Sequence, residues 1–340
     1  MALFSRGIGI DLGTANIVVF VEGKGIVLQE PSVIAVEGEE RSLVAVGEEA
    51  YRMVGRTPGR YQTVHPLREG VIADFGLTQR LLAHTLQRVC GRHPLVRPDV
   101  VVCVPAGVTS VERRAVLDAV LRAGARSCEL ISEPMAAALG AGLEVSEPRG
   151  RMVVDIGGGT TDVAVISMGG EVASASIRVG GNTFDAAVAR HVDRTHNLTI
   201  GPRTAELLKI KVGAARAGAE SRELEVTGAH RPSGLPKSAH VTSEALFPAL
   251  DEPIQAILAG IRSVLERTPA EMAADIYEDG ILLTGGGSLL RDFPQRVSES
   301  LEVPTRLADD PLTCVARGTG HVLESLARRG RAGAAVATRG

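Results

Sequence analysis

Short apolar runs alternate with amphipathic segments through most of the chain. Residues 99–105 form an apolar run of strand length, and residues 110–123 follow it with helical periodicity behind a Thr-Ser cap. The same order recurs at residues 129–132 and 134–139, where a proline occupies the first turn of the expected helix. Strands that alternate with helices predict an α/β fold.

The second half of the chain continues this alternation. Residues 203–214 and 247–267 have helical patterns, and we expect the second helix to kink or restart at Pro253. Residues 281–284 form a short buried strand that runs into three glycines ahead of another helix. Residues 331–340 are rich in Gly, Ala and Arg without apolar periodicity, which predicts a disordered tail.

Composition narrows the class of protein. A chain of 340 residues with 44% hydrophobic and 23% charged residues can fold into two domains. A net charge of -3, 3% aromatic residues and the lack of Trp argue against nucleic-acid binding through charge or base stacking. The four cysteines lack metal-ligand or disulfide spacing, and no apolar run approaches the roughly 20 residues of a membrane span. We therefore expect a cytoplasmic protein that neither crosses a bilayer nor binds nucleic acid.

Two distant segments, residues 9–16 and 154–162, share one pattern. Each reads as a strand, a carboxylate, a glycine turn with Thr and a second apolar strand. Glycine lets backbone N–H groups converge on an anion, so the repeat predicts two similar lobes that clamp a nucleotide's phosphate chain between them. A plain hairpin turn explains either segment alone, but it explains a matched pair less well. The residues expected at the phosphates are Asp11, Gly13, Thr14, Ala15, Asn16, Asp155, Gly157, Gly158, Gly159, Thr160 and Thr161.

The acidic residue in each segment indicates a metal ion. Asp11 and Asp155 would repel phosphate unless a cation lay between them, and Mg²⁺ held through water suits that position. The sequence has no GxxxxGK[ST] loop, and Leu12 stands where a GxGxxG motif needs its third glycine. A metal-bound triphosphate therefore fits better than a dinucleotide.

A third glycine cluster comprises Gly285, Gly286 and Gly287. It lies between a buried strand and a helix, where a flat purine ring could rest against bare backbone. A tight strand-to-helix loop explains the cluster equally well.

Together these features resemble the actin superfamily of ATPases, and within it the MreB family of bacterial actin homologues. The matching segments occur in order and the likeness spans residues 8 to 326. They are residues 8–16, 23–27, 30–32, 70–75, 133–138, 152–167, 178–181, 283–287 and 310–314. The resemblance implies an actin-like fold of two duplicated ribonuclease-H-like lobes, each with a smaller outer subdomain, with Mg-ATP in the cleft between the lobes.

The resemblance also implies a division of the chain into four subdomains. The expected ranges are 1–32, 66–144 and 318–330 for the core of lobe I, 33–65 for its small subdomain, 145–180 and 248–317 for the core of lobe II, and 181–247 for the second small subdomain.

Further residues take roles from the resemblance. Glu133 would polarise the attacking water and Thr160 would assist it, although a helix-capping Glu and a turn Thr explain the same residues. Glu206 and Lys209, on one helix face, would contact the adenosine, and Gly181 would also bind the nucleotide. A surface ion pair is the alternative for Glu206 and Lys209. Asp162 stands where many relatives carry Glu, and we give it no primary role.

The family implies a cytoskeletal function. Proteins of this kind hydrolyse ATP slowly and polymerise into antiparallel double filaments on the inner membrane surface, where they work with membrane proteins of cell-wall elongation to maintain rod shape. Leu3, Phe4, Leu95 and Val96 lie near cationic residues and are candidates for shallow membrane insertion. Inward packing explains these four residues equally well.

Two other classes share the fold. A sugar or small-acid kinase needs insertions for a substrate pocket, and residues 33–65 offer little room for one. A chaperone-type ATPase needs a β-rich substrate domain after the nucleotide-binding module, and we expect none in this chain.

Overall fold

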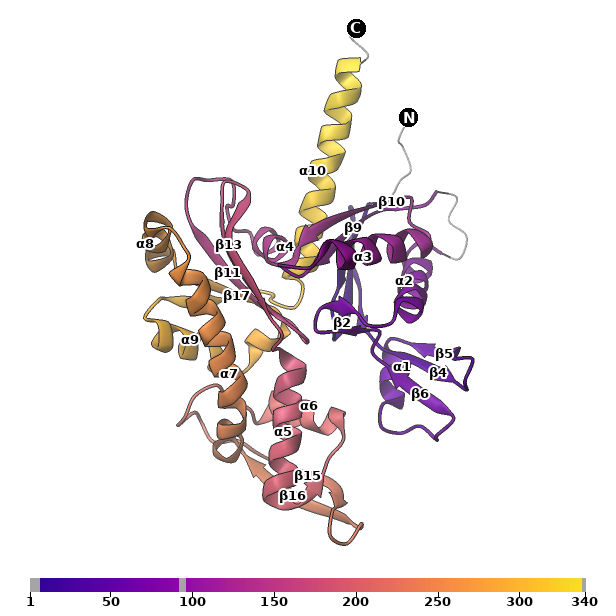
Figure 1. Cartoon of the computed structure of the whole chain (residues 1–340), viewed down its shortest axis with the longest axis vertical. Coiled ribbons are helices and arrows are strands. Elements are labelled where there is room, and N and C mark those ends of the chain that lie inside the picture. The colour runs from indigo at the N-terminus through magenta and orange to yellow at the C-terminus, as the bar shows by residue number, and fades with distance from the viewer. Residues whose placement is uncertain (1–6, 92–95, 338–340) are drawn as a thin grey trace.

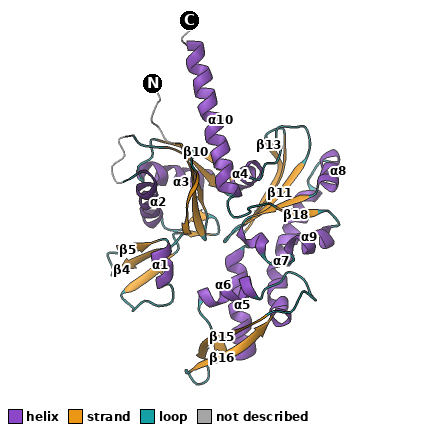
Figure 2. Cartoon of the chain, turned by 180° about the vertical axis from the view of Figure 1, so that it is seen from behind, coloured by secondary structure: helices purple, strands orange, loops and turns teal. Residues whose placement is uncertain are grey.

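Two five-stranded sheets with the same topology form the centre of the molecule (Figures 1 and 2). The structure is a computed structural model, and it describes residues 7–91 and 96–337. The first sheet has the order β10-β9-β1-β2-β3, with β1 (Gly7–Leu12), β2 (Asn16–Val21), β3 (Gly25–Pro31), β9 (Asp99–Val104) and β10 (Ser127–Ser132). The second has the order β13-β12-β11-β17-β18, with β11 (Arg151–Ile156), β12 (Thr161–Ser167), β13 (Gly170–Ile177), β17 (Ile281–Thr284) and β18 (Thr305–Leu307).

The strand directions of the two sheets also correspond. Strand β2 pairs antiparallel with both β1 and β3, while β9 pairs parallel with β1 and β10 pairs parallel with β9. Strands β11, β12 and β13 repeat the antiparallel part, and β17 and β18 repeat the parallel part. Each sheet also has a register shift between its second and third antiparallel strands, at Val19/Phe20 between β2 and β3 and at Val165/Ile166 between β12 and β13. The prediction of two similar lobes is confirmed.

Two small sheets lie below the central ones in the view of Figure 1. The first has the order β5-β4-β6 and carries α1, with β4 (Ile34–Glu37), β5 (Ser42–Val46), α1 (Glu48–Met53) and β6 (Tyr61–Val64). The second has the order β14-β15-β16, with β14 (Leu198–Thr199), β15 (Glu223–His230) and β16 (Pro236–Thr242). A short ribbon of β7 (Leu67–Arg68) and β8 (Val71–Ile72) follows the first small sheet.

Helices cover these sheets. They are α2 (Phe75–Cys90), α3 (Ser110–Arg122), α4 (Glu133–Gly140), α5 (Gly181–His196), α6 (Pro202–Lys211), α7 (Ser243–Glu266), α8 (Ala270–Asp279), the 3₁₀ turn η1 (Gly286–Leu289), α9 (Phe293–Leu301) and α10 (Cys314–Ala337). Helix α3 begins where its sequence predicts, because Thr109 and Glu112 form a reciprocal capping box. No helix in the described ranges is long and apolar enough to pass through a membrane.

Two predicted elements differ from the structure. The expected restart at Pro253 is wrong, since α7 is one helix that continues through that residue, and Ile254 and Ile257 on its apolar face are fully buried and stabilise it. A kink at Pro253 stays a prediction. The predicted disordered tail is wrong for residues 331–337, which extend α10, because Ala and Arg are strong helix formers. Residues 338–340 lie outside the described residues.

The subdomain ranges stay a prediction. The outer sheets fall inside 33–65 and 181–247, as the prediction requires. The proposed breaks at residues 247 and 317, however, fall within α7 and α10 rather than between elements.

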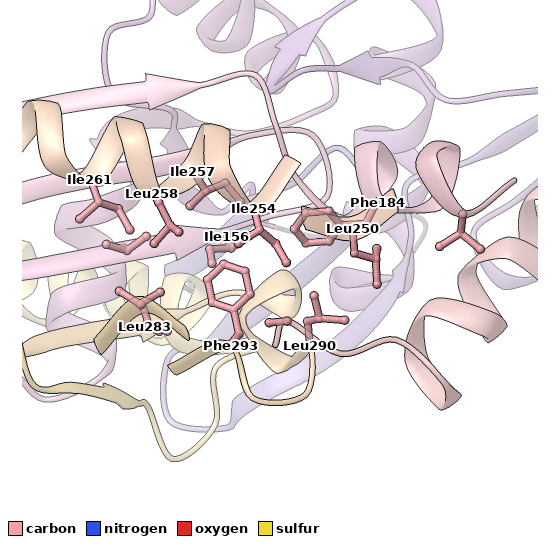
Figure 3. Packing of buried hydrophobic residues seen from close by; sticks show 14 of the residues in the cluster. Ile156, Phe184, Leu250, Ile254, Ile257, Leu258, Ile261, Leu283, Leu290 and Phe293 are labelled. Carbon is pink, nitrogen blue, oxygen red and sulfur yellow. The ribbon is translucent and has the colours of Figure 1, made fainter. Parts of the chain in front are cut away.

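The largest core packs α7 against the second central sheet (Figure 3). Phe293 and Phe184 are fully buried there, among aliphatic residues of α7 and of strands β11 and β17. Burying a large apolar side chain stabilises a fold by about 1.5–3 kcal/mol, so this core stabilises the second lobe, which carries the β11–β12 hairpin.

Helices α4 and α10 pack closely against each other between the two central sheets (Figure 1). A Cβ on Gly140 would lie 1.8 Å from the carbonyl oxygen of Cys314, and one on Gly318 would lie 1.8 Å from that of Ala136. Only glycine allows this approach. This packing fixes α4, whose first residue is Glu133, between the lobes.

Candidate functional site

A cavity of about 330 Å³ opens between the β1–β2 and β11–β12 hairpins. Its walls include Glu133 and every residue predicted for the phosphates, adenosine or metal except Thr161. The predicted residues that line it are Asp11, Gly13, Thr14, Ala15, Asn16, Glu133, Asp155, Gly157, Gly158, Gly159, Thr160, Gly181, Glu206, Lys209, Gly285, Gly286 and Gly287. Residues from six separate parts of the sequence therefore meet at one site.

Thr161 faces away from this cavity. Its side chain is fully buried, and its hydroxyl donates a 2.8 Å hydrogen bond to the carbonyl of Val179. This bond ties the second hairpin to the segment that leads into α5.

The two hairpins touch each other. A Cβ on Gly158 would lie 2.4 Å from the Cβ of Ala15, and one on Gly159 would lie 2.6 Å from the hydroxyl oxygen of Thr14. The Thr14 hydroxyl accepts a 3.0 Å hydrogen bond from the N–H of Gly70. Glycines in the second hairpin thus permit contact with the first, in addition to leaving backbone N–H groups open to an anion.

The start of α5 holds the second hairpin in place. The N–H of Gly181 donates to the carbonyl of Gly157 at 2.9 Å, and the N–H of Asn182 donates to that of Gly158 at 2.8 Å. Within the hairpin, the N–H of Gly157 donates to the carbonyl of Thr160 at 2.9 Å. These bonds place the glycine turn at the positive end of a helix dipole, which favours an anionic ligand.

Asp155 is buried and Asp11 is partly buried, and the two carboxylates repel each other. Burial, then repulsion from Asp155, raises the pKa of Asp11 to about 7, and burial raises the pKa of Asp155 to about 6. The Thr284 hydroxyl donates to Asp155 at 2.7 Å and partly offsets that shift.

This donor set fits a divalent cation, because positive charge between the two carboxylates relieves their repulsion. No cluster of three or more direct ligands occurs among the residues the structure describes. Two carboxylates can hold an ion such as Mg²⁺ through its water ligands.

Glu133 interacts with Asp162, which the sequence did not single out for the site. Burial raises the pKa of Glu133 well above its usual range, followed by repulsion from Asp162, Asp11 and Asp155. Burial also raises the pKa of Asp162 to about 7, although Asp162 accepts a 2.8 Å hydrogen bond from the N–H of Ala106. The predicted hairpin could have revealed Asp162, because antiparallel pairing puts this residue directly opposite Asp155.

Helices α5 and α6 form the other end of the cavity. Lys209 and Glu206 both line it but do not form the surface ion pair considered above. Lys209 instead pairs with Asp185 at 2.9 Å and donates to the Gly181 carbonyl at 3.3 Å, while Glu206 accepts a hydrogen bond from Tyr51. Sequence reasoning missed Asp185, whose position four residues after Gly181 on α5 could have revealed it.

The third glycine cluster is both a tight loop and a cavity wall. Gly285 has φ +79°, and a Cβ there would lie 2.4 Å from the carbonyl oxygen of Ile156. A Cβ on Gly287 would lie 2.4 Å from the Ile156 side chain. Leu289 and Leu312 line the cavity beside these glycines and offer an apolar surface to a flat ring.

The membrane candidates lie mostly outside the described residues. Leu3, Phe4 and Leu95 belong to that part of the chain. Val96 is described and is 43% exposed. Exposure is required for membrane contact, and the role of Val96 stays a prediction.

Comparison with known proteins identifies the family. The family model described as MreB/Mbl protein matches residues 5–331. The chain is 47% identical over 326 residues to the cell shape-determining protein Mbl of Bacillus cereus, covering 96% of this chain and 98% of that protein. It is 48% identical over 334 residues to the cell shape-determining protein MreB of Escherichia coli K12, covering 96% of each.

Solved structures agree with the predicted fold. MreB5 of Spiroplasma citri bound to ADP superposes with a TM-score of 0.91 at 38% identity, covering 96% of this chain and 98% of that one. The same protein bound to AMPPNP gives a TM-score of 0.92 at 38% identity, covering 97% and 99%. A MamK double helical filament, at 21% identity and a TM-score of 0.79 over 94% of this chain and 99% of that one, shares the fold. The actin-like fold is thus confirmed, and this chain belongs to the MreB/Mbl family of actin-like proteins.

Proposed function

We propose that this protein is a cytoskeletal ATPase that binds Mg-ATP between its two lobes and hydrolyses it slowly as a filament subunit. The observation that carries the proposal is the pair of carboxylate-glycine hairpins packed against each other on one cavity. Structures of MreB5 contain ADP and AMPPNP, which supports an adenine nucleotide as the ligand.

The chain supplies separate groups for each part of the nucleotide. The glycine turns at 158–159 and at Gly13 would bind the phosphates through backbone N–H groups, while the N–H of Gly157 closes the second hairpin. Asp11 and Asp155 would hold Mg²⁺ through water, and the ion would neutralise charge on the phosphates when bound. Glu206, Lys209 and the glycines 285–287 would contact the adenosine.

Glu133 is the candidate for orienting the attacking water. It is held at the first turn of α4, lines the cavity and is buried beside Asp162. A carboxylate there would accept a proton from water, and the neighbouring Thr160 hydroxyl would complete the hydrogen bonding. Burial and the neighbouring acids raise the pKa of Glu133, and a cation bound at Asp11 and Asp155 would favour the ionised form that can accept a proton.

The cellular role is proposed from the family. Relatives at 47% and 48% identity are cell shape-determining proteins. We propose that this chain forms antiparallel double filaments on the inner face of the cell membrane and acts there with membrane proteins of wall elongation. Each subunit would contribute a weak membrane contact, and assembly would multiply these contacts into stable attachment.

One experiment tests this function as a whole. Purified protein is incubated with Mg-ATP or Mg-ADP on an anionic lipid monolayer and imaged by electron microscopy, while phosphate release is measured in parallel. We expect paired filaments and slow phosphate release with Mg-ATP. Dispersed particles together with ATP-dependent phosphorylation of a sugar would contradict the cytoskeletal function and indicate a kinase of the same fold.

A further inference from the structure

The helix of one small sheet contacts the nucleotide-facing helix of the other lobe through a single tyrosine. The Tyr51 hydroxyl on α1 donates a hydrogen bond to Oε2 of Glu206 on α6, a residue 155 positions further along the chain. The Arg203 guanidinium lies over the Tyr51 ring, with its central carbon 5.0 Å from the ring centroid. We call the first small sheet with α1 one outer module, and the second small sheet with α5 and α6 the other. Glu206 lines the cavity from the second module, so this contact joins the site to the first module.

Both partners are anchored in different parts of the molecule. On α1, the neighbouring Ala50 is fully buried in a small core with Val33, just before β4, and with Ala35 of β4. On α6, Ala205 and Leu208 on either side of Glu206 are buried in the large core of the second lobe. Movement of one module relative to the other must therefore stretch or break the Tyr51–Glu206 bond.

Other groups near the contact do not link the two modules as Tyr51 does. Lys209, one turn after Glu206, is engaged by Asp185 at 2.9 Å. A second link between the lobes joins Arg178 to Glu69 at 3.2 Å, but these side chains are 70% and 54% exposed and such pairs contribute little. The Tyr51 phenol is partly buried, and its bond to a carboxylate is of the stronger, charge-assisted kind.

We propose that Tyr51 is a positioning residue that fixes the Glu206 carboxylate at the nucleotide site and so keeps the two outer modules together while nucleotide is bound. Tyr51 occupies Oε2 of Glu206, which leaves Oε1 to accept a hydrogen bond from a hydroxyl of the bound nucleoside. Nucleotide release then requires the modules to separate. This inference rests on the proposed function, because it assumes that the cavity binds a nucleotide.

The test measures release of an unmodified nucleotide analogue. Protein loaded with radiolabelled Mg-AMPPNP is mixed with excess unlabelled AMPPNP, and retained label is followed by filter binding. We expect Tyr51→Phe to raise the dissociation rate constant about ten- to a hundredfold, since one hydrogen bond to a charged acceptor is lost. Tyr277→Phe is the matched control, because Tyr277 on α8 is 65% exposed and does not line the cavity, and we expect it to release AMPPNP at the wild-type rate.

The outcomes separate this inference from the proposed function. Equal release rates for wild type and Tyr51→Phe would overturn the role of Tyr51 while leaving nucleotide binding intact. A wild-type protein that retains no AMPPNP would overturn the proposed function and this inference with it.

A spectroscopic measurement tests the hydrogen bond between Tyr51 and Glu206 directly. The protein has three tyrosines and no tryptophan, so the ultraviolet absorbance of phenolate reports each tyrosine's ionisation clearly. Burial and the Glu206 carboxylate raise the pKa of Tyr51 to about 12, so one tyrosine should ionise late in the wild type and earlier in Glu206→Gln. Titration of Tyr51 at the ordinary phenol pKa in the wild type, identified by its loss in Tyr51→Phe, would overturn the proposal.

Discussion

Gly158 lies directly against Ala15, at the point where the two hairpins meet. A methyl group on Gly158 would come within 2.4 Å of the Ala15 Cβ and 3.2 Å of its N atom. Because Ala15 belongs to the first hairpin and Gly158 to the second, this contact sets how closely the two phosphate-type turns approach. The cavity depends on that spacing.

Gly158→Ala should weaken nucleotide binding. The added methyl group must push the hairpins apart, and such overpacking costs about 1–3 kcal/mol, which corresponds to an affinity loss of about 5- to 150-fold. Isothermal titration with Mg-AMPPNP measures the change. Gly59→Ala is the control, since a Cβ on Gly59 meets nothing within 4 Å; wild-type affinity in Gly158→Ala would show that the hairpins do not need this contact.

Glu133→Gln should separate binding from hydrolysis. The amide keeps the size of the side chain but cannot accept a proton from water, so phosphate release should fall about 10²- to 10⁴-fold while AMPPNP affinity changes little. Single-turnover phosphate release under saturating Mg-ATP gives the rate. Glu129→Gln, an exposed position on β10, should retain wild-type turnover, and equal turnover in both variants would contradict the role of Glu133.

Without metal or nucleotide, the protein should lose stability as pH rises from about 5 to about 8. The pKa of Asp11 is about 7 in the folded protein, against a usual value of 3.8, and that of Asp155 is about 6. In this window the folded state retains protons that the unfolded state has released, so deprotonation favours unfolding. Asp11 alone should contribute about 2 kcal/mol, measured by urea unfolding in EDTA.

Asp11→Asn is the control for that pH dependence. An amide at position 11 does not titrate. Because it is neutral, it also removes the repulsion that exists between Asp11 and Asp155 in the wild type. The stability of Asp11→Asn should therefore vary less between about pH 5 and pH 8. Identical pH profiles for the variant and the wild type would exclude Asp11 as the source of the effect.

Phe293→Ala should destabilise the second lobe by about 3–5 kcal/mol, because it leaves a cavity in a closely packed core. Phe293 is fully buried at the start of α9 beside Ile254 and Leu290 (Figure 3). The shift in the urea unfolding midpoint measures the loss. Leu235→Ala, on an exposed turn between β15 and β16, should change stability by less than about 0.5 kcal/mol; equal losses for the two variants would contradict the core assignment.

Much of the site was readable from the sequence because local chemistry specifies it. A carboxylate followed by a glycine turn between two apolar strands dictates its own hairpin, and both copies, around Asp11 and Asp155, lie where the pattern predicts. Likewise, the capping signals at Thr109 and the proline after Glu133 set the starts of α3 and α4. Such signals act over a few residues and need no partner from elsewhere in the chain.

Other features depend on partners far away in sequence. Packing of α4 brings Glu133 to the acids of the second hairpin, Asp155 and Asp162, which are close to each other in sequence but distant from Glu133. Asp185 becomes part of the site only because α5 and α6 pack side by side and Lys209 reaches it. Pro253 suggested a restart within α7, but the helix continues through it because its apolar face is buried against distant strands.

The sequence alone therefore determined the two phosphate-type hairpins, the alternation of strands and helices and the candidate residues for nucleotide binding. The tertiary structure decided which of these residues share the cavity, why Thr161 does not, and how Tyr51 reaches Glu206 across the two lobes. The reason is physical: hairpins, caps and turns arise from local backbone and side-chain chemistry. Burial, charge repulsion and contacts between modules exist only after distant segments have packed together.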